Sequence, residues 1–258
     1  MSSTCYFCRP ADILTAAATL SLTAGAADAA FPLTNLQDGR AHTVFKSTGN
    51  AATIRSTFGS PVTLEAVAVH FHKLAGATVD VTNGAGLDES LVIPANTPDG
   101  HCLDPWLDLR GFANLTSDIW DLEITGAATV VAIGELLWIE TIREFEVQRG
   151  IVQEEELATV VHAGDYHPRI AAYHLGSRVR AFQGHLTPKT SADELLTLHR
   201  GAKGPLTPFW LVPDSTVNDA LYGHLIPARH QFVESFPRGS GARETDVEFV
   251  EALRGLPL

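Results

Sequence analysis

The sequence predicts a mainly β protein that consists of two β units, an N-terminal β-sandwich and a second β unit with one short helix. Short runs of alternating apolar and polar residues recur along the chain, as expected of strands with one face on a core. Turn residues such as Pro94, Pro98, Gly100 and Pro105 fall between these runs. Hydrophobic residues make up 45% of the 258 positions, which is enough to fill a core and excludes a wholly disordered chain.

Six runs in the first half of the chain have strand character. They are residues 53–58, 62–72, 77–82, 90–93, 119–125 and 129–139. The tripeptide Gly59-Ser60-Pro61 closes the first run, and the strong turn dipeptide Asn83-Gly84 closes the third. Several short strands separated by turn signals are typical of a β-sandwich.

The run 62–72 predicts which side chains face the core. Val67, Val69 and Phe71 share one face, and we expect this face to point inward. His70 and His72 lie on the other face, which we interpret as the polar face of a half-buried strand.

The second half contains further strand signals and one helix signal. Ser191 and Glu194 fit a capping box, so we predict a helix that begins near Ser191 and ends by Gly204. Loss of the cap in Ser191→Ala should cost about 1 kcal/mol. The predicted strands are residues 141–149, 179–185, 209–212, 222–226 and 230–236, and residues 247–253 fit either a strand or a short helix.

The pattern changes around Glu140, and we place the domain boundary there. Residues 1–140 then form the sandwich, and residues 141–258 form the second unit with its helix near 191–203. No internal repeat and no low-complexity linker separates the halves.

The net charge and the cysteine content argue against some classes of protein, namely nucleic-acid-binding proteins and disulfide-rich proteins. The net charge is −12, which repels phosphate backbones and argues against nucleic-acid binding. Three cysteines are too few for a disulfide framework, so we expect free thiols in a reducing compartment. Residues 13–30 resemble a leader peptide, but residues 18–23 alternate as a strand would, and we prefer the strand. No run approaches the length of a membrane span, and we expect a soluble protein.

Two groups of residues raise the question of a metal. Cys5 and Cys8 form a C-x-x-C, and with Cys102 and His101 they would complete a zinc ligand set. Adjacent side chains such as His101 and Cys102 diverge in a strand, so we favour ordinary thiols. His70 and His72 would lie about 6–7 Å apart on one strand face, but a third ligand is missing. We therefore predict no bound metal.

The remaining polar clusters carry no catalytic motif. His162, Asp165, His167 and His174 suggest acid–base chemistry, but no nucleophile motif accompanies them, and Gly164 with Pro168 indicates an exposed loop. The run 154–156 (EEE) indicates a solvated surface, and the run 84–86 (GAG) lacks the context of a dinucleotide site. We predict no catalytic residues, no cofactor-binding residues and no enzymatic activity.

The first half resembles a known fold family. Residues 31–40 read FPLTNLQDGR, residues 44–48 read VFKST, and residues 133–138 read IGELLW. This pattern resembles a galactose-binding-like (discoidin-type) sandwich, a domain that occurs in structural proteins of tailed bacteriophages. The chain departs from the pattern at Phe45, where Trp is common, and at residues 70–74 (HFHKL), where GHNL is common.

The second half is similar to tail-tip proteins of bacteriophages, including distal tail proteins. The similarity is carried by residues 182–186 (FQGHL), 194–195 (EL), 208–213 (PFWLVP) and 222–225 (YGHL). In such proteins these passages build a tail-tube-like split β-barrel. Their motifs are structural, so no functional residue is carried over.

The resemblance implies a structural component of the virion. It implies a hexameric ring at the tail tip or baseplate, assembled in the host cytoplasm, that joins the tail tube protein to hub and fibre proteins around the DNA channel. We expect the second unit to carry the ring contacts and the sandwich to project outward. An acidic channel wall would let DNA pass without binding. The resemblance implies neither a cofactor nor a membrane.

Two other function classes compete with this interpretation. A carbohydrate-binding module would hold a host glycan on exposed rings, for which Trp106 and Trp120 are the candidates, although Trp106 also looks like a core anchor. The third hypothesis is a metallohydrolase in which the histidines bind the metal.

Overall fold

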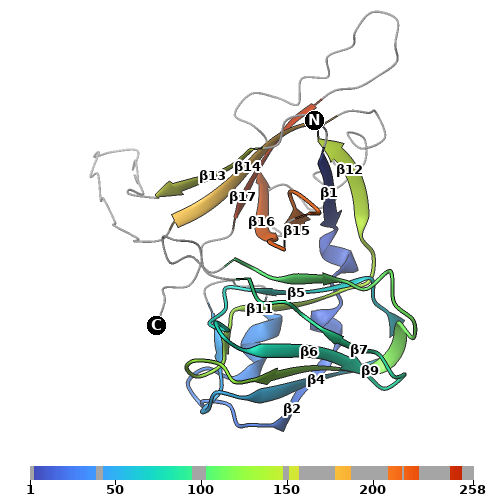
Figure 1. Cartoon of the computed structure of the whole chain (residues 1–258), viewed down its shortest axis with the longest axis vertical. Coiled ribbons are helices and arrows are strands. Elements are labelled where there is room, and N and C mark those ends of the chain that lie inside the picture. Colours follow the sequence, from blue (N-terminus) through green and yellow to red (C-terminus); the bar gives the residue numbers. More distant parts are fainter. Residues whose placement is uncertain are drawn as a thin grey trace, which may run out of the picture.

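The computed structural model describes residues 3–38, 43–94, 103–147, 151–156, 178–186, 209–216, 218–226 and 245–251. Within these ranges the chain is mainly β (Figure 1), and the helical segments are short 3-10 turns. They are η1 (Pro10–Asp12), η2 (Thr15–Ala17) and η3 (Leu33–Gln37). Among these same residues, no helix is long and apolar enough to cross a membrane.

A β-sandwich forms the lower half of the molecule in Figure 1. One layer is a five-stranded antiparallel sheet, in the order β2 (Thr19–Ala24), β4 (Ala52–Thr63), β9 (Thr116–Thr125), β6 (Thr78–Asn83) and β7 (Asp88–Ser90). The other layer contains β11 (Glu135–Ile139), β5 (Ala66–His70) and β8 (Trp106–Asp108). A short pair, β10 (Ala132–Ile133) with β3 (Phe45–Lys46), completes it. The predicted sandwich is confirmed.

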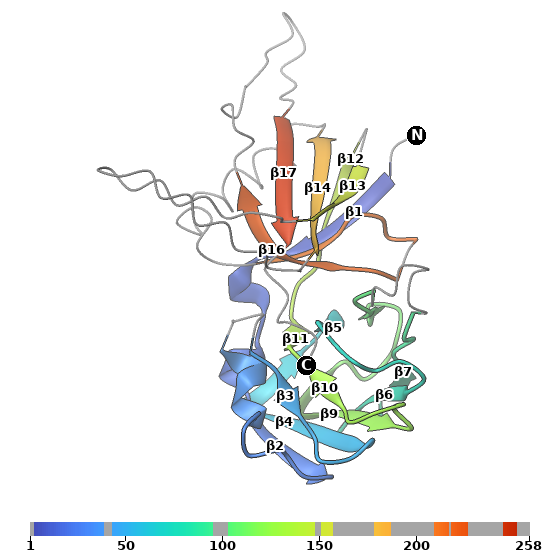
Figure 2. The same cartoon turned by 90° about the vertical axis from the view of Figure 1, so that its left-hand side faces the viewer.

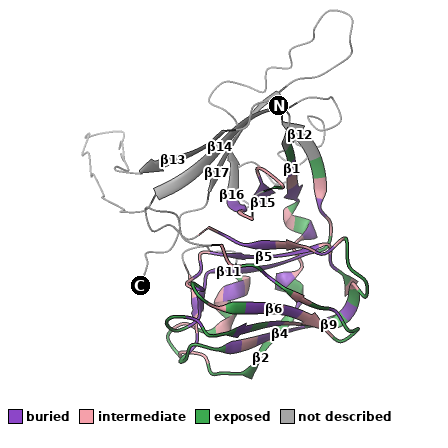
Figure 3. Ribbon diagram, in the orientation of Figure 1, coloured by how far each residue is buried: buried purple, intermediate pink, exposed green. Residues whose placement is uncertain are grey.

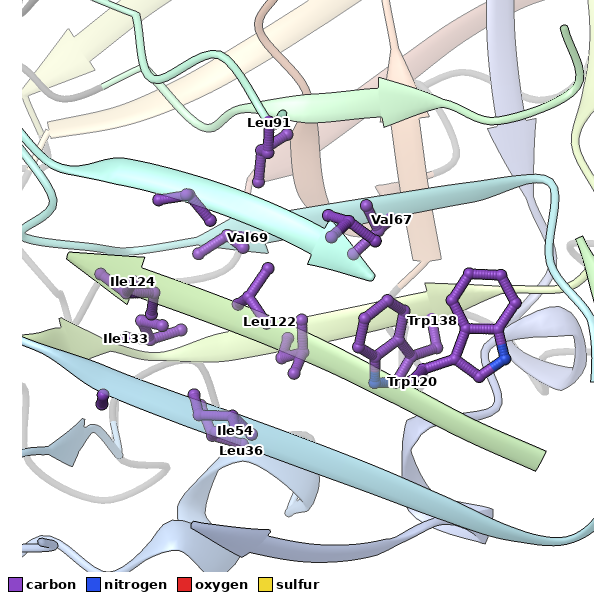
Figure 4. Close-up of a cluster of buried hydrophobic side chains, with 14 of the residues drawn as sticks. Leu36, Ile54, Val67, Val69, Leu91, Trp120, Leu122, Ile124, Ile133 and Trp138 are labelled. Atoms are coloured by element: carbon purple, nitrogen blue, oxygen red, sulfur yellow. The ribbon is translucent and has the colours of Figure 1, made fainter. Parts of the chain in front are cut away.

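The sandwich core lies between these two layers. Figure 4 shows Val67 and Val69 of β5 pointing toward Leu122 and Ile124 of β9, with Trp138 nearby. All five side chains are fully buried, so together they remove several hundred Å² of apolar surface from water, at about 25 cal/mol per Å². The prediction that Val67 and Val69 face inward is confirmed.

The run 62–72 is not one strand. β4 continues through Gly59, Ser60 and Pro61, which were expected to end it, with a register shift between Thr57 and Val62. A bulge of this kind absorbs the proline, which cannot donate to a regular ladder. β5 then begins at Ala66 and ends at His70.

The expectation for Phe71 and the histidines is wrong. Phe71 has φ of 55°, which ends the alternation and turns its ring away from the sandwich core toward a second apolar cluster. His70 is fully buried and His72 is 4% exposed, so neither lies on a polar face. A half-buried strand would expose them, but the outer face of β5 is covered by the second unit.

That second unit is a seven-stranded antiparallel sheet. Its order is β12 (Arg143–Val147), β1 (Ser3–Cys8), β15 (Phe209–Val212), β16 (Leu221–Ile226), β17 (Thr245–Glu251), β14 (Arg178–Leu186) and β13 (Ile151–Glu156). An additional pairing of Val147 in β12 with Leu186 in β14 links the first strand back to the sixth. Figure 2 shows the strands standing above the sandwich. The pairings therefore close six of the seven strands on themselves.

The sandwich is inserted between two adjacent strands of this sheet. Phe7 of β1 pairs with Arg143 of β12, and the chain between them contains the whole sandwich. The two connections remain paired beyond the sheet, because Ile13 bridges Ile139. The sequence predicts that the sandwich spans residues 1–140, but β1, at the start of this range, pairs with β12 and β15 of the seven-stranded sheet.

Most other predicted strands are present. The runs near 141–149, 179–185, 209–212 and 222–226 correspond to β12, β14, β15 and β16, and the ambiguous run 247–253 is mostly a strand, β17. β13 was not predicted, because its run of three glutamates indicated a surface segment. The helix predicted from Ser191 and the strand predicted at residues 230–236 lie outside the described residues.

Candidate functional site at the junction of the two units

The two units share a buried junction. Every residue of β5 and β11 is buried, because one face of these strands packs into the sandwich and the other packs toward the seven-stranded sheet (Figure 3). The junction is largely apolar. Its buried members are Cys8, Ala66, Ala68, Trp106, Leu137, Ile139, Ile142, Trp210, Val212, Ala220 and Tyr222. An interface of this composition holds the units rigidly together.

A histidine–aspartate pair is buried in the junction. The Nδ1 atom of His70 lies 3.3 Å from Oδ2 of Asp104, and both side chains are completely buried. The distance is within ion-pair range, but neither ring nitrogen of His70 makes a well-aligned hydrogen bond. Asp104 is held by its other oxygen, which accepts a 2.8 Å bond from the Phe71 amide. The His70–Asp104 pair is therefore sealed from solvent inside the junction.

Glu135 is the unusual group of the junction. It pairs directly opposite His70 across β11 and β5, and 2% of its surface is exposed. Its Oε1 atom has no hydrogen-bond partner. Burial, together with the negative charge of Asp38, raises the pKa of Glu135 to about 8. Near neutral pH the carboxyl is therefore largely protonated and becomes a carboxylate only in mildly alkaline solution or beside a cation.

Tyr222 of β16 completes the polar cluster. Its ring centroid lies 5.5 Å from that of His70. Burial and the neighbouring charge of Glu135 raise the pKa of its hydroxyl, so this group stays neutral across the physiological range.

Glu135 and Tyr222 line a cavity of about 240 Å³. The cavity lies where the sandwich meets η1, η2, η3 and β16. Its other lining residues are Pro10, Ile13, Thr15, Ala16, Leu36, Gln37, Leu136 and Leu137. A concave, partly open space with mostly apolar lining residues and a few polar groups is the usual form of a small-molecule site.

The cysteines predicted as possible ligands are structural. Cys5 and Cys8 are both buried in β1. The thiol of Cys5 donates a 2.7 Å hydrogen bond to the carbonyl oxygen of Pro213, and burial raises the pKa of the Cys8 thiol. His101 and Cys102 lie outside the described residues. In the part of the chain that is described, no three His, Cys, Asp or Glu side chains are grouped to hold a metal ion.

His72 is committed to the local backbone. Its Nδ1 atom accepts a bond from the Leu74 amide at 3.2 Å, so the proton must sit on Nε2, which donates to the Leu103 carbonyl at 2.9 Å. A ring held at both nitrogens cannot share a metal with His70.

Trp106 and Trp120 do not form a glycan surface. Trp120 is completely buried against Trp138, and Trp106 packs edge-on against Tyr6 and Trp210 in the junction. Both rings are core anchors.

The other predicted clusters add nothing to this site. The cluster of His162, Asp165, His167 and His174 lies outside the described residues. Residues 84–86 lie in the turn that joins β6 to β7. Glu135 was missed, although one signal was available: it is the single charged side chain in the apolar run 129–139.

No protein-family model matches the sequence, and no curated protein matches it either. Solved structures similar to the sandwich include the family 32 CBM from C. perfringens NanJ in complex with galactose, with 10% identity, a TM-score of 0.39, and coverage of 55% of this chain and 100% of that chain. Chitosan-binding module 1 from a Paenibacillus sp. IK-5 chitosanase/glucanase has 19% identity, a TM-score of 0.36, and coverage of 48% and 96%. A fucose binding module of Streptococcus pneumoniae, SpX-3, has 8% identity, a TM-score of 0.38, and coverage of 50% and 98%. Each of these matches covers about half of this chain.

Proposed function

We propose that the chain is a structural component of a bacteriophage tail tip, of the distal-tail type. In this proposal the seven-stranded sheet builds a homo-oligomeric ring and the sandwich projects from it. The observation that carries the proposal is the insertion of the sandwich between β1 and β12, two neighbouring strands of the sheet. Because the sandwich is inserted at one end of the β1–β12 pair, the other strands of the sheet remain available to contact neighbouring copies of the chain.

The closed pairing of the sheet supports the same proposal. Six strands close through the contact of Val147 with Leu186, which fits a split barrel of the tail-tube type. Three of the four passages that resemble tail-tip proteins coincide with β14, β15 and β16, and the fourth, residues 194–195, lies outside the described residues. These motifs therefore mark the unit that would form the ring.

β13 offers an edge for a neighbouring copy. It lies outside the closed set of six strands and, among the described strands, it pairs with β14 alone. An open edge exposes unpaired N–H and C=O groups, and a repeated head-to-tail contact that covers it closes a ring. The net charge of −12 suits a ring through which DNA passes.

The proposal is tested by the mass of the purified full chain in solution. We expect a hexamer by light scattering and a ring by electron microscopy. Successive residues of a strand direct their backbone groups to opposite sides, so one of Val152→Pro and Gln153→Pro should break only the outer edge of β13. That variant should stay folded and lose the ring. A chain that is monomeric at every concentration would contradict the proposal.

Glycan binding by the sandwich is a second candidate function. Phe112, in the loop between β8 and β9, is the exposed aromatic ring among the described residues, at 37% exposure. Next to it the side-chain amide of Asn83 donates a 2.7 Å bond to the carbonyl oxygen of Asn114, which ties this loop to the β6–β7 turn. The similar solved modules are named for galactose, chitosan or fucose, but that likeness concerns the fold, so this candidate rests on Phe112 itself.

A glycan array separates this candidate from a purely structural role. We expect any glycan signal to be lost in Phe112→Ala, because a stacking ring would be removed. Val130→Ala is the matched control, since Val130 is exposed to a similar degree, 39%, in the loop that follows the other end of β9. A signal that survives Phe112→Ala would place the glycan elsewhere.

A further inference from the structure

We propose that the cavity between η1, η2, η3, β11 and β16 binds a primary ammonium group on a short aliphatic stem, with Glu135 as its counter-ion. This cavity does not include the edge strand β13 or the loop that carries Phe112. It stands whether or not the chain forms a tail tip.

Glu135 supplies the first argument, because it is a buried acid without a partner. Its Oε1 atom makes no hydrogen bond, and no described cationic side chain forms an ion pair with it. Arg9, which is next to the cavity residue Pro10, is already bound to Asp12 at 2.8 Å. A buried carboxyl that lacks a partner is costly to the fold, and a bound cation removes that cost.

The other polar groups of the cavity favour a hydrogen-bond donor as the ligand. The side-chain nitrogen of Gln37 donates to the carbonyl oxygens of Thr15 and Ala18, each at 2.7 Å. Both of its N–H groups are therefore used, and the side-chain oxygen of Gln37 is the atom that can accept a hydrogen bond from a ligand. Thr15 donates its hydroxyl to the Leu136 carbonyl and accepts the Trp138 amide. An ammonium group has three donors and no acceptor, which matches a site whose free groups accept.

The walls of the cavity favour an aliphatic stem. Ile13, Leu36, Leu136 and Leu137 are aliphatic residues among those that line the cavity, and its volume of about 240 Å³ admits a chain of a few methylenes. The ammonium end then lies at Glu135 and Tyr222 while the stem packs on the leucines. A metal ion or an inorganic anion would leave these apolar walls unused.

Two sources can supply this chemistry, a free alkylamine or a lysine side chain of another copy. Binding of n-butylammonium is measured by calorimetry at pH 6 and pH 9, with n-butanol and butyrate as uncharged and anionic controls. We expect binding at least 10-fold tighter at pH 9 than at pH 6, because Glu135 must ionise to pair with the amine. Glu135→Gln should weaken binding at least 10-fold and remove the pH dependence.

The pH dependence is assigned by comparison with this variant. Asp38 after η3, His70 on β5 and Tyr222 on β16 also face Glu135, and all three are unchanged in Glu135→Gln. Glu123→Gln, at an exposed carboxylate on β9, is the control that should behave as the native chain. A thermal melt of each variant confirms that it is folded.

The oligomer mass distinguishes the two sources. If a lysine of another copy occupies the site, n-butylammonium and Glu135→Gln both lower the mass of the native oligomer. If a free amine is the ligand, the mass is unchanged and binding persists. Equal binding of butanol or butyrate, unchanged binding in Glu135→Gln, or no amine binding together with an unchanged mass in Glu135→Gln would overturn the proposal.

Discussion

The indole N–H of Trp138 donates a 2.7 Å hydrogen bond to the hydroxyl oxygen of Ser56, and this bond joins the two layers of the sandwich. Trp138 belongs to β11 and Ser56 to β4, and both are fully buried. The indole nitrogen of one of the two tryptophans in the sandwich core is thus satisfied by a serine of the facing sheet, as a buried indole requires.

Ser56→Ala should therefore destabilise the sandwich. It leaves the indole N–H of Trp138 buried without a partner, which costs about 1–3 kcal/mol. Urea unfolding of the variant measures this loss. Ser60→Ala is the matched control, because Ser60 is exposed on the same strand and should change stability by less than about 0.5 kcal/mol. Equal effects of the two variants would show that the hydroxyl of Ser56 is not needed.

Glu135→Gln should stabilise the protein, and increasingly so as pH rises. The folded pKa of Glu135 is raised from 4.5 to about 8, so the folded state binds more protons than the unfolded state between these values. Stability of the native chain therefore falls across this window, by up to about 5 kcal/mol from this group. Urea unfolding at pH 5, 7 and 9 checks the sign. A stability difference between variant and native chain that is constant with pH would contradict it.

Arg110→Lys should weaken the connection between the sandwich and β12. The guanidinium of Arg110 holds both oxygens of Asp108, at 2.9 and 2.7 Å, and one oxygen of Glu144 at 2.7 Å, while it lies over the ring of Tyr6. Lysine keeps the charge and loses the bidentate geometry, which should cost about 1 kcal/mol because these groups are partly exposed.

This effect should disappear in acid. Partial burial acts to raise the pKa of Asp108, but the hydrogen bonds and charge of Arg110 outweigh it and lower the pKa below its usual value. The stabilisation is therefore complete above the unfolded pKa of Asp108 and lost as pH falls through the folded one. Unfolding of Arg110→Lys and the native chain at pH 7 and pH 2.5 measures this. Arg55→Lys is the comparison, because the guanidinium of Arg55 also binds both oxygens of one carboxylate, that of Asp121, and is more exposed than the guanidinium of Arg110.

The thiols of Cys5 and Cys8 should resist modification in the folded protein. Both are buried, and burial raises the pKa of Cys8, so little reactive thiolate forms. In a Cys102→Ser background, a thiol reagent at pH 8 should label neither residue within minutes and should label both after denaturation. Rapid labelling of the folded chain would mean that β1 opens.

The sandwich could be predicted because its strands obey local rules. β9 alternates buried and exposed side chains along most of its length, so period-2 patterns located it without knowledge of its neighbours. β5 and β11 are buried on both faces, and their alternation carries no information about which side meets solvent. His70 was assigned to a polar face for this reason.

The candidate site could not be predicted from local patterns. Glu135, Tyr222 and Gln37 come from distant parts of the chain and line one cavity only in the folded structure. The pairing of Phe7 with Arg143 spans the whole sandwich, and no periodicity encodes a contact of that separation. The position of Glu135 as the single acid in an apolar run is a signal that the sequence contains, but the cavity beside it is visible only in the folded structure.

The insertion of the sandwich between β1 and β12 has a mechanical consequence. The two connections start side by side at Phe7 and Arg143 and stay bridged at Ile13 and Ile139, so a pull on the sandwich loads both strands together and in the same direction. The β1–β12 ladder then bears little of the load, because its two strands move as one. The tension passes to the outer neighbours, as shear along the β1–β15 ladder and at the pairing of Val147 in β12 with Leu186 in β14. A domain joined to a sheet by two paired connections resists twisting and transmits an applied force into the sheet. A single flexible linker would instead extend under that force.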